Sequence, residues 1–191
     1  GRYSAICVPS AASTERVSFG IETLDDMLGG GIYRGSSALV SGTAGTGKSS
    51  LAVQMVDAAC RRGERCLYVA LEESPVQIER NMASVGFDLA QWRRAGLLHF
   101  HATRPTSCGL EAHLATLVAL VREVRPQFVV IDPITAYSTR GYEERVKLML
   151  IRAVDLFKSM GITSVFTALT YGGNAEESTS VSISSVVDVW L

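Results

Sequence analysis

The feature that most constrains this chain is a glycine-rich stretch at residues 36–49, SSALVSGTAGTGKS. Its second half has the spacing G-x-x-x-x-G-K-S, with a short apolar run before it and a helix-forming run, 50–62, after it. A strand, a loop of this spacing and a helix together predict a P-loop, whose backbone N–H groups surround the phosphates of a nucleoside triphosphate. The predicted phosphate-binding residues are Gly42, Thr43, Ala44, Gly45, Thr46, Gly47, Lys48, Ser49 and Ser50.

Three further side-chain features point to the terminal phosphates and a metal ion. Lys48 adds a full positive charge beside the terminal phosphates, and the hydroxyl of Ser49 suits Mg²⁺, a hard cation that prefers oxygen ligands. Asp132 ends the apolar run FVVI at 128–131, and four apolar residues followed by an acid are typical of a Walker B strand, whose carboxylate steadies Mg²⁺. The alternative for Asp132 is a carboxylate that caps a following helix.

Glu72 and Glu73 follow a second apolar run, 65–71, and ligands gather at the carboxyl ends of strands in an open parallel sheet. If that strand neighbours the P-loop strand, one carboxylate reaches the γ-phosphate and serves as a general base for water or a hydroxyl. The other carboxylate then orients the base or tunes its pKa, and we expect Glu73 to lie near Mg²⁺. The alternative is a solvated acid pair near the start of a helix, where the helix dipole favours it.

The order of apolar and amphipathic segments predicts an α/β fold with one mostly parallel sheet flanked by helices. A length of 191 residues suits a single domain, which we place at 17–191, with 1–16 as a linker or tail. Residues 74–77, SPVQ, predict a helix start with a capping box. Strands are expected directly before Gly42 and at 65–71, 97–102, 128–131, 162–168 and 184–191, and helices at 24–28, 50–62, 75–85, 88–94, 110–124 and 142–160.

Composition limits the location and the partners of the chain. The formal net charge is −1, which gives no global reason to expect nucleic acid. No apolar segment is long enough to span a bilayer, and the N-terminus has no signal-peptide pattern. The four cysteines have no C-x-x-C spacing, so we interpret them as reduced thiols of a cytoplasmic protein.

Three segments together, 42–49, 72–74 and 130–133, resemble the RecA-type P-loop ATPases and most closely the circadian clock KaiC family. The resemblance covers nearly the whole chain, from 16–20 to the final strand. It implies a RecA-like ATPase domain that uses ATP and Mg²⁺, with Glu72 as the base. KaiC proteins carry two such domains in tandem and form hexameric rings in which the next subunit completes each nucleotide site. The resemblance therefore also implies a homo-oligomer and clock partner proteins.

The segment SISSVVD at 182–188 resembles the second of the two KaiC domains. In that domain an adjacent pair of hydroxyl residues, with an Asp a few residues on, is the autophosphorylation site. The matching positions are Ser184 and Ser185, so the resemblance implies serine autokinase activity. The hairpin that follows in the family lies beyond Leu191, and we expect a domain truncated at its C-terminal end. The alternative for the serine pair is two hydroxyls at the start of an edge strand.

Two other classes of protein are compatible with the same core residues. A RecA- or RadA-like DNA-dependent ATPase has a comparable glutamate but needs basic loops that face DNA. The loop 170–182 holds Glu176 and Glu177 and no Lys or Arg, which disfavours a nucleic-acid partner. The third class is a nucleotide-switched assembly module, in which ATP binding orders a ring and hydrolysis is incidental.

Overall fold

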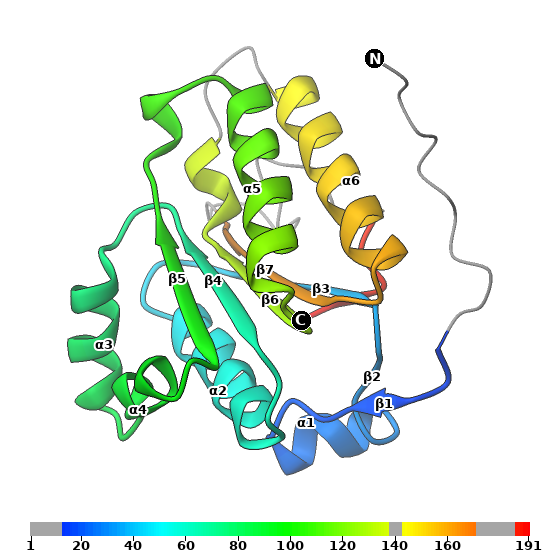
Figure 1. The fold of residues 1–191 in the computed structure, drawn as a ribbon. Helices are drawn as coiled ribbons and strands as arrows, with labels where there is room; N and C mark the ends of the chain where they lie inside the picture. Colours follow the sequence, from blue (N-terminus) through cyan, green and yellow to red (C-terminus); the bar gives the residue numbers. More distant parts are fainter. Residues whose placement is uncertain (1–12, 138–142, 171–185) are drawn as a thin grey trace.

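The computed structural model describes residues 13–137, 143–170 and 186–191, and its centre is a six-stranded sheet (Figure 1). The strands are β3 (Ser37–Gly42), β4 (Cys66–Ala70), β5 (Leu98–Ala102), β6 (Phe128–Asp132), β7 (Thr163–Leu169) and β8 (Val189–Trp190). They lie in the order β5-β4-β6-β7-β3-β8, and all of the recorded pairs are parallel. The predicted α/β fold with a parallel sheet is confirmed.

Helices cover both faces of this sheet (Figure 1). One face packs against α2 (Lys48–Arg61), α3 (Pro75–Ala83) and α4 (Leu89–Arg94), and the other against α5 (Leu110–Val124) and α6 (Glu143–Ser159). Successive strand residues point to opposite faces, so Leu67 and Val69 join the α5–α6 core while Cys66 and Tyr68 join the α2 core. Both faces are buried, which explains why the strands appear in the sequence as nearly continuous apolar runs.

Local sequence signals give several element bounds correctly. The helix predicted at 110–124 is α5, and α3 starts with the predicted capping box. In that box the Ser74 hydroxyl accepts from the Gln77 N–H at 3.4 Å, and Gln77 Oε1 accepts from the Ser74 N–H at 2.9 Å. α2 begins at Lys48, two residues before the predicted start, because the end of the P-loop already has helical backbone. In the described part of the predicted strand 184–191, only Val189–Trp190 is a strand.

Two short 3₁₀ helices, η1 (Pro105–Ser107) and η2 (Ile134–Tyr137), follow β5 and β6 respectively.

Within the described part of the chain, no helix combines the length and the apolar character that crossing a bilayer requires.

A small N-terminal unit precedes the sheet. It consists of the antiparallel pair β1 (Arg16–Val17) and β2 (Ile32–Tyr33), with α1 (Glu22–Met27) between the two strands. The Asp25 carboxylate accepts from the Ser18 hydroxyl at 2.6 Å and from the Phe19 N–H at 2.7 Å. Gly31 has φ 104°, and a Cβ there would lie 2.1 Å from the carbonyl oxygen of Val17. Only glycine fits at this position, where the chain bends into β2.

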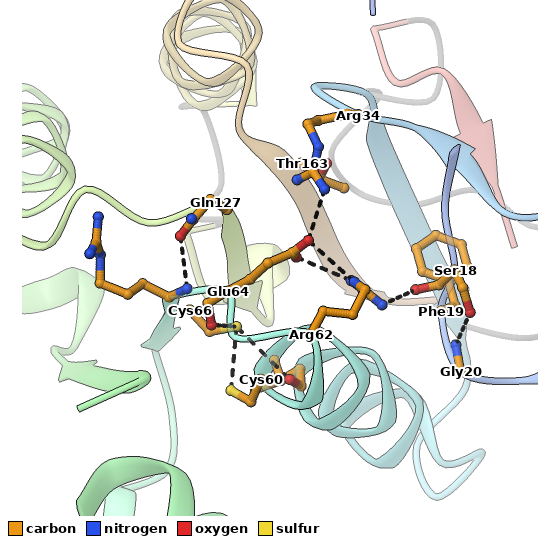
Figure 2. A network of polar contacts seen from close by, with 12 residues as sticks. Ser18, Phe19, Gly20, Arg34, Cys60, Arg62, Glu64, Cys66, Gln127 and Thr163 are labelled. Atoms are coloured by element: carbon orange, nitrogen blue, oxygen red, sulfur yellow. Dashed lines mark hydrogen bonds and ion pairs between the residues drawn. The ribbon is translucent and has the colours of Figure 1, made fainter. Parts of the chain in front are cut away.

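A cluster of ion pairs lies at the amino ends of the strands (Figure 2). Glu64, which precedes β4 and is 7% exposed, accepts from Arg34 at 2.8 Å and from Arg62 at 3.1 Å. Burial acts to raise the pKa of Glu64, but hydrogen bonds from Arg62 and Arg34 outweigh it, and the pKa is lowered. Arg62 also donates to the backbone carbonyl of Ser18 at 2.8 Å, so the cluster joins the N-terminal unit to the sheet.

Candidate active site

The P-loop joins the end of β3 to the start of α2, and its backbone passes twice through the left-handed region. Gly45 has φ 82° and Gly47 has φ 85°, conformations that strain any residue with a side chain. The carbonyl oxygen of Thr43 accepts from Lys48 Nζ at 2.6 Å and from Thr46 Oγ1 at 2.9 Å. The loop therefore curls around this carbonyl and keeps the ammonium group of Lys48 at its rim.

The first turn of α2 offers backbone donors to an anion. Its N-cap, Gly47, makes no side-chain capping bond, so the N–H groups of the first turn are not capped by this residue. A 14-residue helix also presents the positive end of its dipole at this point. Partial burial lowers the pKa of Lys48, and the charge of Asp132 opposes that change. The arrangement fits a phosphate group.

A cavity of about 370 Å³ lies at the carboxyl ends of the strands, and most of the predicted site residues line it. Three segments far apart in sequence meet there: the P-loop, the turn after β4 and the end of β6. The predicted residues that line the cavity are Ala44, Gly45, Gly47, Lys48, Ser49, Ser50, Glu72, Glu73 and Asp132. Gly42, Thr43 and Thr46 instead line an adjoining hollow of about 680 Å³, which shares Gly47, Lys48 and Ser50 with the cavity.

The strand before Glu72 does not neighbour the P-loop strand, so the condition under which we placed a carboxylate at the γ-phosphate is not met. β6 and β7 lie between β4 and β3. The acid pair reaches the cavity nevertheless, because all carboxyl ends of a parallel sheet lie along one edge. Glu72 and Lys48 therefore face the same cavity although two strands separate the strands that carry them, and Asp132, at the end of β6, lies between them along this edge.

The two glutamates have different surroundings. Glu73 Oε2 accepts from Asn81 Nδ2 of α3 at 3.1 Å, which ties this side chain to the helix that follows. Within the described ranges no hydrogen bond or ion pair is recorded for the Glu72 side chain. Partial burial raises the pKa of Glu72, and the charges of Asp132 and Glu73 add to the rise. This raised pKa increases the tendency of Glu72 to accept a proton.

Asp132 is held by two hydroxyl groups from neighbouring strands. Its carboxylate accepts from the Tyr68 hydroxyl of β4 at 2.5 Å and from the Thr167 hydroxyl of β7. No backbone N–H of a described residue donates to this carboxylate, so the structure does not support the alternative in which Asp132 caps a helix. Asp132 lines the cavity together with residues of the P-loop.

The oxygen donors at the cavity suit a magnesium ion that arrives with phosphate. Ser49 and Asp132 both line the cavity, and Mg²⁺ is usually held by one or two protein ligands together with phosphates and water. Over residues 13–137, 143–170 and 186–191, no group of three or more His, Cys, Asp or Glu side chains could hold a metal ion without such help. The residues present therefore fit a metal bound with the nucleotide.

The predicted phosphorylation residues, Ser184 and Ser185, lie outside the described residues. Asp188, which follows them, lies within and is firmly anchored. Its carboxylate accepts from the Ser37 N–H at 2.8 Å and from Lys158 Nζ at 2.9 Å. These contacts fix the start of β8 beside β3, the strand that leads into the P-loop.

Three residues of the site were not predicted from the sequence. Tyr68 and Thr167 hold Asp132, and Asn81 holds Glu73. A phenol inside a buried apolar run is itself a signal, since a buried hydroxyl requires a partner. The same signal exists for Thr167 in β7. No local pattern marks Asn81, which lies on an ordinary amphipathic helix.

Comparison with known proteins gives the family. A family profile described as "ATPase: KaiC" matches residues 17–189. The chain is 47% identical over 192 residues to the circadian clock protein KaiC2 of Synechocystis sp., a match that covers 98% of this chain and 34% of that protein. It is 35% identical over 189 residues to the circadian clock oscillator protein KaiC of Picosynechococcus sp., covering 98% of this chain and 36% of that protein. The chain thus spans about a third of the length of these relatives, and it belongs to the KaiC ATPase family.

Proposed function

We propose that this chain binds and hydrolyses ATP with Mg²⁺ at the 370 Å³ cavity. The observation that supports this most strongly is that Lys48, Glu72 and Asp132 line one cavity although they come from three separate segments. A cation, a partly buried carboxylate with a raised pKa and a second carboxylate at the end of a strand are the groups that phosphoryl transfer needs.

Each residue has a separate task in this proposal. Lys48 and the first turn of α2 bind the phosphates, while Ser49 and Asp132 would hold Mg²⁺, which when bound would supply positive charge to the phosphate oxygens. Glu72 accepts a proton from the attacking water as the new oxygen–phosphorus bond forms and the bond from the γ-phosphorus to the β–γ bridging oxygen breaks, so that ADP leaves. Glu73, fixed by Asn81, lies in the same cavity and adds to the rise in the pKa of Glu72, after partial burial and the charge of Asp132.

The adjoining hollow suits the nucleobase. Leu51, Phe87 and Leu191 give it apolar walls, and it shares three P-loop residues with the cavity. If the nucleobase lies on this side of the P-loop, its planar ring would pack against these apolar side chains. Ligand sites usually hold aromatic groups in this way.

The test of ATP binding is Lys48→Ala, measured by titration calorimetry with Mg·ATP. Among the described residues, the Lys48 side chain has a single hydrogen bond, to the Thr43 carbonyl, so we expect the fold to survive and ATP binding to be lost. Lys147→Ala on α6 is the matched control and should bind as the unaltered chain does. Unchanged affinity in a folded Lys48→Ala variant would contradict the proposal.

We further propose that the chain is the second of two KaiC-type domains and that Ser184 and Ser185 accept the γ-phosphoryl group. The resemblance at 182–188 supports this, together with the similarity to clock proteins that are about three times longer. The serine hydroxyl oxygen would bond to phosphorus as the β–γ bridging bond of ATP breaks, with Glu72 of a neighbouring subunit taking the hydroxyl proton.

The native-length protein gives the test of autophosphorylation. After incubation with Mg·ATP, peptide mapping should find phosphate on Ser184 and Ser185, and the double variant Ser184→Ala/Ser185→Ala should carry none there. A Lys48→Ala chain should be phosphorylated only when mixed with chains that have an intact P-loop. Absence of phosphate on both serines leaves a plain ATPase.

A homo-oligomeric ring, with a hexamer as the expected size, belongs to the same proposal. Light scattering with and without a non-hydrolysable ATP analogue should show nucleotide-dependent assembly. If hydrolysis is slow but the size of the oligomer depends on the bound nucleotide, the result would favour a nucleotide-switched assembly module. Retention of single-stranded DNA in filter binding would favour a DNA-dependent motor. In that case we would not expect clock proteins as partners.

A cytoplasmic location is part of the proposal too. Cys60 and Cys66 are free thiols although their sulfurs lie 3.6 Å apart, which supports a reducing compartment.

A further inference from the structure

Buried hydroxyl groups hold the Asp132 carboxylate from both sides. Tyr68 donates to Oδ2 at 2.5 Å, and Thr167 donates to Oδ1. Both donors have no solvent exposure, and their strands, β4 and β7, are the two neighbours of β6. Each carboxylate oxygen therefore has one hydroxyl partner that water does not reach.

Packing fixes Tyr68 in turn. Its ring lies 5.4 Å from that of Phe100, centroid to centroid, within the core between the sheet and α2. The Tyr68 hydroxyl donates to the carboxylate, which can only accept.

We propose that Tyr68 and Thr167 are positioning residues for the metal ion that accompanies the nucleotide, acting through Asp132. The inference rests on the proposed function of the cavity. A carboxylate with a fixed donor on each oxygen cannot turn about its Cβ–Cγ bond without breaking both hydrogen bonds. Its remaining lone pairs therefore keep one direction, toward the cavity where Mg²⁺ and its water ligands would lie. Outer partners of this kind typically change metal affinity by about 10–100-fold.

The experiment separates the metal-dependent part of nucleotide affinity from the rest. Calorimetry measures the Kd of a non-hydrolysable ATP analogue once with Mg²⁺ and once with EDTA. In Tyr68→Phe, which keeps the ring and its contact with Phe100, the Kd with Mg²⁺ should rise, so that the ratio of the Kd in EDTA to the Kd with Mg²⁺ should fall by about tenfold. The Kd in EDTA should not change. Tyr137→Phe removes the hydroxyl of another buried tyrosine outside the Asp132 contacts and should keep the full ratio.

Two variants of Thr167 test the positioning role independently. They also test it if Tyr68→Phe does not fold. Thr167→Val removes the hydroxyl at nearly constant shape and should lower the same ratio, while Thr167→Ser keeps the hydroxyl and should restore it. Thermal unfolding of each variant confirms that the protein measured is folded.

The outcomes distinguish this inference from the function on which it depends. If the unaltered chain binds no nucleotide under either condition, the proposed function fails and the positioning role with it. If it binds with a clear Mg²⁺ dependence and the hydroxyl deletions leave the ratio unchanged, the positioning role alone is overturned. A fall in affinity that is equal with Mg²⁺ and with EDTA would also overturn it, since that result indicates a general structural effect.

Discussion

The indole Nε1 of Trp190 donates a 2.7 Å hydrogen bond to the hydroxyl of Ser41, the residue immediately before the first P-loop glycine. The backbone repeats the link: the Ser41 N–H donates to the Leu191 carbonyl at 2.9 Å, and the Leu191 N–H donates to the Leu39 carbonyl at 2.8 Å. The C-terminal segment thus fixes the strand from which the P-loop leaves.

Trp190→Phe should weaken ATP binding by about fivefold, because it removes one hydrogen bond that holds the P-loop strand while keeping an aromatic ring. Ser41→Ala removes the acceptor and should have the same effect. If the two groups act only on each other, the double variant loses no more than either single variant, which calorimetry can measure as a double-mutant cycle. Losses that simply add would show that the contact does not act on binding.

Glu72→Gln should keep Mg·ATP affinity and lose most of the turnover. The amide preserves the shape but cannot accept a proton, and general-base catalysis is typically worth about 10²–10⁴-fold. Glu73→Gln is the matched control, with a smaller loss because that side chain only influences its neighbour. A loss below about threefold in Glu72→Gln, measured by phosphate release, would remove this residue from the role of base.

The rate of hydrolysis should fall at acidic pH, and the fall should occur above the ordinary glutamate pKa of 4.5. The pKa of Glu72 is raised, so the carboxylate becomes protonated, and inactive as a base, at a higher pH than an ordinary glutamate. Glu73→Gln removes one of the charges that raise this pKa and should move the acid limb of kcat to lower pH. Circular dichroism at each pH confirms that the fold persists. If the acid limb of kcat does not move in Glu73→Gln, Glu73 does not influence the pKa of the base.

Glu64→Gln should lower the free energy of unfolding by about 2 kcal/mol at pH 7, since it removes a buried carboxylate that accepts from two arginines. The pKa of Glu64 is lowered in the folded protein, so its stabilising effect is present above pH 4.5 and is lost as the pH falls through the lowered pKa. The difference between the two proteins in urea unfolding should therefore shrink at acidic pH. Glu123→Gln, an exposed change on α5, should have little effect at any pH.

Local signals in the sequence were sufficient for much of the fold. The helix at 110–124, the capping box at Ser74 and the P-loop each depend on residues within a few positions of one another, so spacing alone predicts them. The order of the strands does not depend on such spacing. An apolar run such as 65–71 indicates burial on both faces, but it carries no information about which strand lies beside it.

The site shows the same division between local and long-range information. Asp132 and the glutamate pair are found from the strand ends that they follow. The hydroxyls of Tyr68 and Thr167 meet Asp132 only because the sheet places β4 and β7 on either side of β6. Tyr68 is separated from Asp132 by 64 positions in the sequence, and Thr167 by 35. No periodic pattern in the sequence predicts contacts over such separations. The roles of Ser184 and Ser185 stay predictions.

The ion pairs of Glu64 and the carboxylate of Glu72 lie at opposite ends of β4. A strand rises about 3.3 Å per residue, which places the two ends of Cys66–Ala70 about 13 Å apart. Substitutions at that separation, without shared partners, have free-energy effects that usually add. Substitutions at the Glu72 edge of the sheet can therefore change the proposed chemistry while the stability that the Glu64 ion pairs give stays the same, so the two properties can vary independently.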